Sequence, residues 1–441
     1  MENLVDIIFE CDIKGLSNLN FPIGERFGLI VHFNNVKYEF LINLKSNSDK
    51  LLCLGAGALG TDSKHDRLKP YFNRWSWDFE YSSICYNDPT MYLSDELTGG
   101  WGIGVPNDYY LEKISLIILI ISQSISVPPE NIIFYGSSAG GFMSIMLSIL
   151  IKGSTAIADI PQLMLENYFN WEDIKKHCFK DIVENDVFEI FKYRFNVVEM
   201  CIHENYIPNA ILIFDCSVTH DITLQYVPFI NCLNQLPYTN ATNNFQIIIN
   251  GKNKGHAPLG KKESYDLLDD VITNKLLSKN SQNFKEFHRS NNALEKRILN
   301  NINEIVFGDY IFDCPGDFIT LGVNSNNSLK IVNLEGTIKL FITPYGRNGN
   351  YCKSDFERML KSYNEDSETS LIHFNSFVKD NISNYNILVS KVDFYESIYF
   401  ICKYDKTFRL SFIIKNKDID TFKIVEGIYN SIRVNDLNSI S

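Results

Sequence analysis

Residues 131–141 read NIIFYGSSAGG, and this stretch decides the fold. The apolar run Ile132–Phe134 predicts a short strand, and an apolar helix is predicted over Phe142–Lys152. Between them, residues 136–140 (GSSAG) fit the G-x-S-x-G pattern of a nucleophile elbow, a sharp turn that exposes a serine hydroxyl. This order of strand, motif and helix predicts an α/β-hydrolase-type sheet with Ser138 as the nucleophile. The alternative is a glycine-rich turn around a buried serine. A Walker loop is excluded because no Gly-Lys-Ser/Thr follows.

The composition describes a globular protein of more than one domain. A chain of 441 residues is too long for one ordinary core, so we expect two or three domains. The net charge of −12 argues against general nucleic-acid binding, because no strongly basic face is available to neutralise phosphates. The longest apolar run, Leu116–Ile121, is far shorter than the roughly 20 residues that span a bilayer. We therefore expect no membrane span.

The cysteines and the N-terminus indicate a cytoplasmic protein. Ten cysteines are scattered singly, without a C-x-x-C pair, which favours reduced thiols over disulfides or zinc. Residues 1–6, MENLVD, carry acids where a signal peptide needs basic residues. No cofactor and no metal site are expected.

The first part of the chain alternates between strands and helices. Residues 1–48 are expected to be a β region packed on the main sheet, with a hairpin that turns at Asn34-Asn35. Residues 49–277 predict a doubly wound parallel sheet whose ligand site lies at the carboxyl ends of the strands. Within them, residues 163–208 are predicted to form a helical insertion, which is either a cap over the site or an ordinary packed insertion.

The last part of the chain is predicted to be a separate domain. The polar residues 278–292 suit a linker, and residues 293–441 alternate in the manner of an α+β domain. Its order of elements bears a weak similarity of pattern to the Mog1/PsbP fold. No group of reactive side chains stands out there, so we expect it to serve binding or assembly and to contact a protein partner.

A serine nucleophile needs a general base, and in this fold the chain order is Ser, acid, His. His256 follows the last predicted strand of the sheet, Phe245–Asn250, in a loop flanked by Gly251 and Gly255. His256 is therefore the expected base, and an ordinary surface histidine is the alternative. His220 is the one rival, but it stands where the acid is expected.

Three carboxylates compete for the orienting acid. Asp221 follows the predicted strand Ala210–Phe214 and is preferred. Asp215 at the tip of that strand and Asp159 at the end of the preceding strand are the rivals. Each of them could instead cap a helix or a turn, as aspartate often does.

Two further sets of residues complete the expected site. The oxyanion hole is expected to use the backbone N–H of Ala139 and that of Ala56, which lies in a glycine-rich loop after the first strand of the sheet. Arg74 and Trp75 are expected to bind substrate, because the loop around them is aromatic and polar, as a surface that binds a sugar would be. Tryptophan also simply fills cores.

The chain is similar to the bacterial XcbB/CpsF-type capsular polysaccharide biosynthesis proteins, which are α/β-hydrolase-like and akin to accessory-secretion O-acetyltransferases. The matching motifs lie in order over roughly residues 50–275: YFNRWSW (71–77), NDPT (87–90), FYGSSAGGF (134–142), GSTAIA (153–158), PQ (161–162) and PF (228–229). The resemblance implies a Ser138 nucleophile with a histidine and an acid, and a role in building or decorating surface glycans. The chain departs from the family pattern at Asp159-Ile160 and at Val218-Thr219, so the acid stays open.

Two functions of different classes follow. The first is a serine esterase or acyltransferase that acts through an acyl-enzyme on a carbohydrate or an acylated small molecule. The second is a non-catalytic assembly or binding protein of a polysaccharide biosynthesis system. Hydrolysis and acyl transfer share the same residues and differ in whether water or a sugar hydroxyl resolves the acyl-enzyme.

Overall fold

The computed structural model describes residues 1–434 except 2–3, 61–62, 181, 183, 237–244, 252–254, 275–290, 292–293, 295–301, 308–309, 317, 324–327, 334–337, 345–348, 366–368, 380–381, 392–393, 404–405 and 416–418. The chain divides into two compact units. Unit 1 comprises Met1–Val187 and Phe191–Leu299, and unit 2 comprises Phe188–Ile190 and Asn300–Ser441. Nearly all of the predicted linker, 278–292, lies outside the described residues.

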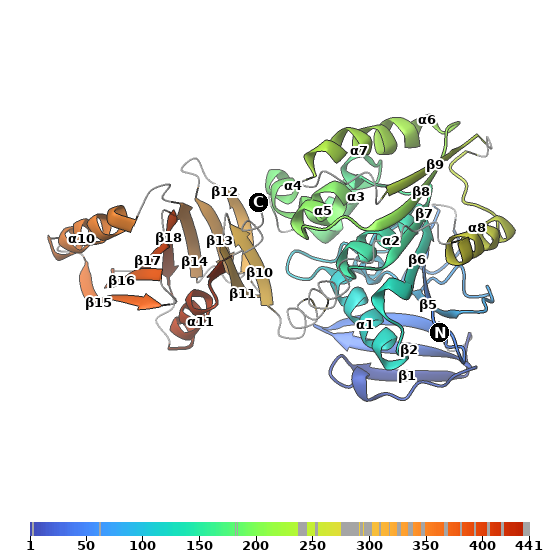
Figure 1. The fold of residues 1–441 in the computed structure, drawn as a ribbon, viewed down its shortest axis with the longest axis horizontal. Helices are drawn as coiled ribbons and strands as arrows, with labels where there is room; N and C mark the ends of the chain where they lie inside the picture. The colour runs from blue at the N-terminus through green and yellow to red at the C-terminus, as the bar shows by residue number, and fades with distance from the viewer. Residues whose placement is uncertain are drawn as a thin grey trace. The chain divides into compact units, whose positions relative to one another are not determined.

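Unit 1 is built on a nine-stranded sheet of order β1-β2-β3-β5-β4-β6-β7-β8-β9 (Figure 1). Its last six strands run parallel to one another. They are β4 (Leu51–Gly55), β5 (Ser82–Tyr86), β6 (Ile132–Ser137), β7 (Thr155–Asp159), β8 (Asn209–Asp215) and β9 (Phe245–Asn250). Residues of β4 to β7 are all buried, as parallel strands covered on both faces require. The predicted parallel sheet is confirmed.

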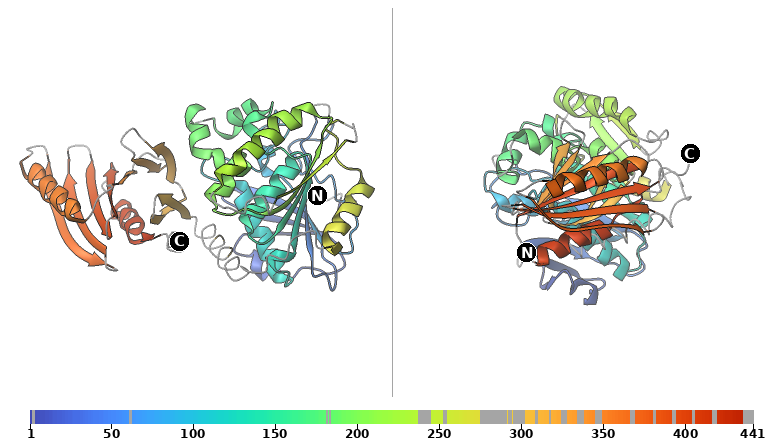
Figure 2. Two further views of the ribbon diagram at one scale, coloured as in Figure 1. Left: turned by 45° about the horizontal axis from the view of Figure 1, so that its top comes forward. Right: turned by 90° about the vertical axis from the view of Figure 1, so that its left-hand side faces the viewer.

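Helices cover both faces of this sheet (Figures 1 and 2). The helices α1 (Tyr110–Ser124) and α2 (Ala139–Leu150) lie on one face, and α8 (Lys261–Asn274) lies on the other. Alternate strand residues such as Ile133 and Tyr135 share an apolar cluster with Leu268 and Val271 of α8. The period of two along each strand thus divides the core between two helical layers.

The N-terminal strands, which we had expected to pack on the main sheet, continue that sheet beyond β5. They are β1 (Ile7–Asp12), β2 (Arg26–Phe33) and β3 (Val36–Asn43), and β3 pairs antiparallel with β5. The β2–β3 hairpin turns at Asn34 and Asn35, whose φ angles of 49° and 62° are both left-handed, as a two-residue hairpin turn demands. The pairing supplies backbone partners to an edge of β5 that would otherwise be unpaired.

The predicted helical stretch after β7 consists of several short helices. They are a 3₁₀ turn, η4 (Leu165–Asn167), and α3 (Trp171–Cys178), α4 (Glu184–Phe195) and α5 (Val197–His203). The Asn196 side chain caps α5 by accepting from Val198 N and Glu199 N, and its Nδ2 donates to Glu166 Oε1 at 2.6 Å. Among the described residues, the buried Glu166 Oε2 has no partner.

Replacing Glu166 by glutamine should flatten part of the pH dependence of stability. Burial raises the pKa of Glu166 from 4.5 to about 7, so the folded protein retains a proton that the unfolded chain loses. The stability of the wild type should therefore fall as pH rises from 4.5 to 7, by roughly 3 kcal/mol in all. Thermal unfolding followed by tryptophan fluorescence isolates unit 1, since all four tryptophans (Trp75, Trp77, Trp101 and Trp171) lie there. Parallel pH profiles of wild type and Glu166→Gln would contradict this prediction.

Unit 2 is an antiparallel α+β unit. Its described strands form a three-stranded sheet, β10-β11-β19, and a seven-stranded sheet, β12-β13-β14-β18-β17-β16-β15. The strands are β10 (Ile302–Phe307), β11 (Tyr310–Pro315), β12 (Phe318–Val323), β13 (Leu329–Asn333), β14 (Ile338–Pro344), β15 (Ser370–Lys379), β16 (Ile382–Ser390), β17 (Tyr395–Lys403), β18 (Lys406–Ile414) and β19 (Arg433–Val434). The helix α10 (Gly349–Glu365) packs on β16 and β17, and α11 (Ile419–Asn430) packs on β11.

Three kinds of feature are absent from the described residues. No helix there combines the length and the apolar character that a membrane crossing needs. No disulfide joins the cysteines of these residues. No group of His, Cys, Asp and Glu side chains in the same residues is arranged to hold a metal ion.

Candidate active site

Ser138 occupies a strained turn between β6 and α2. Its φ of 55° and ψ of −119° lie outside the regions that a non-glycine residue ordinarily adopts. The turn is held from both sides, since Ser138 N donates to Asp159 O at 2.9 Å and Phe142 N donates to Ser138 O at 3.0 Å. Strain of this kind persists only where the surrounding structure enforces it, and it is common at functional sites.

The two glycines of the motif are required by close backbone approaches. A Cβ on Gly136 would lie 2.2 Å from the carbonyl oxygen of Gly140. A Cβ on Gly140 would lie 2.6 Å from the carbonyl oxygen of Gly55, at the end of β4. Only glycine therefore allows β4, β6 and the start of α2 to meet behind Ser138.

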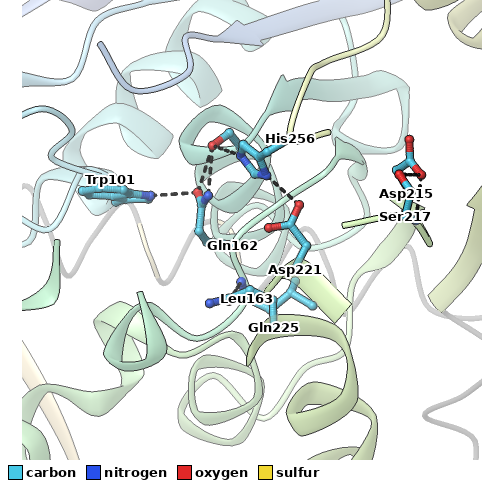
Figure 3. A network of polar contacts seen from close by, with 9 residues as sticks. Trp101, Gln162, Leu163, Asp215, Ser217, Asp221, Gln225 and His256 are labelled. Carbon is cyan, nitrogen blue, oxygen red and sulfur yellow. Dashed lines mark hydrogen bonds and ion pairs between the residues drawn. The ribbon is translucent and has the colours of Figure 1, made fainter. Parts of the chain in front are cut away.

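Two hydrogen bonds link His256 to Ser138 and to Asp221, and Figure 3 shows the one to Asp221. His256 Nε2 lies 3.0 Å from Ser138 Oγ, and His256 Nδ1 lies 2.6 Å from Asp221 Oδ2. Asp221 ends the short helix α6 (Thr219–Asp221) after β8, and its side chain is 6% exposed. Because an ionised carboxylate only accepts, Nδ1 carries the proton and Nε2 is left to accept the Ser138 hydroxyl.

The two rival carboxylates have other partners. Asp215 Oδ1 accepts from Ser217 N at 3.0 Å and from Ser217 Oγ at 2.7 Å, away from His256 (Figure 3). Asp159 Oδ2 accepts from Ser137 Oγ at 3.0 Å and from Leu259 N at 2.7 Å. Burial raises the pKa of Asp159, and these hydrogen bonds oppose the rise. Asp159 thus ties the loop that carries His256 to the end of β7.

The two alanines expected to form the oxyanion hole line one cavity of about 30 Å³. Ala139 is the first residue of α2, so its N–H has no acceptor within the helix. Ala56 follows β4, and Gly57, Ala58 and Met143 also line the cavity. The cavity therefore lies beside Ala139, the residue that follows Ser138.

Arg74 and Trp75, the expected substrate contacts, are instead engaged in packing. Arg74 is only 5% exposed, and its guanidinium donates to Gly55 O at 2.6 Å and to Ser137 Oγ at 2.7 Å. It therefore joins the ends of β4 and β6. Trp75 is half-buried against the cluster beneath α8 and lies under the Arg26 guanidinium, 5.1 Å from the ring centroid. The aromatic and polar residues of this loop thus make contacts within unit 1.

Replacing Arg74 by methionine should destabilise unit 1. The change leaves two buried acceptors without their donor, at a cost of roughly 2–4 kcal/mol. Arg26→Met is the matched control, because Arg26 is exposed and its loss should cost no more than about 0.5 kcal/mol. Tryptophan fluorescence during thermal unfolding measures both changes. Equal shifts of the two variants would show that the buried contacts of Arg74 contribute little.

Gln162 also contacts the nucleophile, and it was missed as a site residue. Its Nε2 lies 2.9 Å from Ser138 Oγ, and its Oε1 accepts from Trp101 Nε1 at 3.2 Å (Figure 3). Gln162 belongs to the pair Pro161-Gln162, shortly after the carboxyl end of β7. Its position after a strand, at the edge of the sheet where the site was expected, could have identified Gln162 as a site residue.

Neither a protein-family model nor a curated protein matches the sequence of this chain. Among solved structures, the capsule O-acetyltransferase of Neisseria meningitidis serogroup A is similar with a TM-score of 0.41 and 16% identity, over 59% of this chain and 99% of that chain. An esterase of Thermogutta terrifontis has a TM-score of 0.37 and 12% identity, over 56% and 91% of the two chains. The PsbP protein of Synechocystis has a TM-score of 0.26 and 12% identity, over 31% and 93%. These TM-scores are below 0.5, and we infer no function from them.

Proposed function

We propose that the chain is a serine-dependent acyl-transfer enzyme of the α/β-hydrolase type, either an esterase or an O-acyltransferase. Ser138, His256 and Asp221 are its catalytic triad. The observation that carries the proposal is the continuous hydrogen-bonded chain from Asp221 through His256 to a serine at a strained strand-to-helix turn. A scaffold protein has no evident need for this combination.

The proposed reaction proceeds through a covalent acyl-enzyme. Ser138 Oγ attacks the ester carbonyl carbon while His256 Nε2 takes the hydroxyl proton. Asp221 holds the Nδ1–H tautomer and stabilises the imidazolium. The C–O bond to the leaving alcohol then breaks, and His256 returns the proton to that alcohol. Water or a second hydroxyl, deprotonated by His256, resolves the acyl-enzyme and restores the Ser138 hydroxyl.

The negative charge of the tetrahedral intermediate needs donors on the side away from His256. We assign these donors to the N–H groups of Ala139 and Ala56. The assignment is supported by two observations: both alanines line one cavity, and Ala139 directly follows Ser138 in the chain. The expected glycan substrate rests on the resemblance to capsular polysaccharide proteins.

Covalent labelling of the full chain with a fluorophosphonate probe tests this function. Such a probe reacts with an activated serine and leaves buried structural serines untouched. We expect one label that maps to Ser138, and none on the neighbouring Ser137, which is 3% exposed. Complete absence of labelling, together with inactivity on a panel of acyl esters, would favour the non-catalytic assembly function.

A further inference from the structure

We propose that Gln162 is a further catalytic residue of this site, whose side-chain amide donates to Ser138 Oγ and holds the hydroxyl in line with His256. This inference rests on the proposed function. Gln162 is 1% exposed and is therefore placed by its surroundings, not by solvent. Its amide hydrogen bond reaches the reacting oxygen itself.

The indole of Trp101 determines which way the Gln162 amide faces. Indole nitrogen is a donor only, so the amide atom 3.2 Å from Trp101 Nε1 must be the acceptor Oε1. Nε2 is then the atom that faces Ser138 Oγ at 2.9 Å. Trp101 is fully buried, so its indole N–H is held in place. Its left-handed φ of 51° costs free energy in a non-glycine residue and persists because the surrounding structure enforces it.

The contacts of Ser138 Oγ are consistent with one assignment of hydrogen-bond donors and acceptors. The hydroxyl proton goes to His256 Nε2 at 3.0 Å, because His256 Nδ1–H donates to Asp221. Oγ then accepts from Gln162 Nε2. Donation of the hydroxyl to Gln162 Oε1 is disfavoured, because that distance is 3.4 Å and Oε1 already accepts from Trp101.

The amide contributes to the step in which Oγ becomes a nucleophile. As the proton moves to His256, negative charge grows on Oγ, and a hydrogen bond to a charged acceptor is stronger than one to a neutral hydroxyl. Gln162 therefore favours the attacking form over the resting one. It transfers no proton and forms no covalent bond, so the balance of the reaction is unchanged.

Gln225 holds the backbone that follows Gln162, and Figure 3 shows it beside Leu163. Its Oε1 accepts from Leu163 N at 2.7 Å and Met164 N at 2.9 Å, and its Nε2 donates to Met164 O at 3.1 Å. Gln225 lies four residues after Asp221 in one continuous helical segment. The helical segment that carries Asp221 thus also holds the backbone next to Gln162.

A double-mutant cycle on the full chain tests the role of Gln162. Gln162→Met keeps the side-chain length and removes the donor, and it should lower the rate constant of fluorophosphonate labelling and kcat by roughly 10- to 100-fold with KM little changed. Trp101→Phe frees the amide to turn and should cost roughly 3- to 10-fold. The double variant should be no slower than Gln162→Met alone, because Trp101 acts through the amide. Gln123→Met, at an exposed position of α1, is the control and should label at the wild-type rate.

The outcomes are distinct. Labelling of Gln162→Met at the wild-type rate, or losses that multiply in the double variant, would overturn the inference while leaving the triad in place. If Gln162→Met does not fold, Trp101→Phe decides alone, and a wild-type rate in that variant would overturn the inference. A wild-type protein that does not label at all would overturn the proposed function instead.

Discussion

Replacing Ser138 by alanine should lower kcat for any acyl ester that the protein cleaves by roughly 10⁶-fold and should abolish fluorophosphonate labelling. His256→Ala should lower kcat to a similar extent, because neither residue can form the acyl-enzyme without the other. The double variant should therefore be no slower than either single one. Initial rates on the best ester of a panel measure all three.

The fold should survive the Ser138→Ala change. Alanine meets the same backbone strain at φ 55° as serine does, and only the hydroxyl is lost. Ser217→Ala is the matched control, because the Ser217 hydroxyl bonds Asp215 and not His256. Activity of Ser138→Ala near the wild-type value would remove Ser138 as the nucleophile. A double variant far slower than both single ones would mean that Ser138 and His256 act separately.

Replacing Asp221 by asparagine should lower kcat by up to ~10⁴-fold. The amide keeps the shape of the carboxylate but can donate to Nδ1. It thereby favours the imidazole tautomer whose Nε2 carries the proton and cannot take one from Ser138. The same substitution at Asp215 should have a small effect, since that carboxylate caps the turn at Ser217.

Comparing the two substitutions identifies the acid. Labelling rates and kcat should fall together in Asp221→Asn, while thermal unfolding changes little. A larger fall of kcat in Asp215→Asn than in Asp221→Asn would identify Asp215 as the orienting acid. Small and equal losses would indicate a Ser138–His256 dyad that works without a carboxylate.

Much of the arrangement was predictable because its signals are local. The G-x-S-x-G motif between a strand and a helix indicates a tight turn, and close approaches at Gly136 and Gly140 demand glycine there. The position of His256 follows from its place in a loop after the last strand of the sheet. For unit 2 the sequence predicted an α+β domain, while the order and pairing of its strands come from the structure.

Side-chain partners across the sheet could not be predicted in the same way. Asp159 ends β7, Asp215 ends β8 and Asp221 follows β8, so chain order places all three near the carboxyl edge of the sheet. Only the packing of α6 brings Asp221 to His256, while Asp159 is bonded to Leu259. Arg74 shows the same limit, because an exposed arginine in a sugar platform and a buried one joining two strands look alike in sequence.

The sequence by itself determined the parallel sheet, the turn at Ser138 and the loop of His256, because short-range periodicity and turn chemistry encode them. The tertiary structure decided which carboxylate meets His256, the burial of Arg74 and the place of Gln162 beside Ser138. These contacts join residues far apart in the chain, and their free energy depends on distances and burial that arise only when the strands and helices pack together.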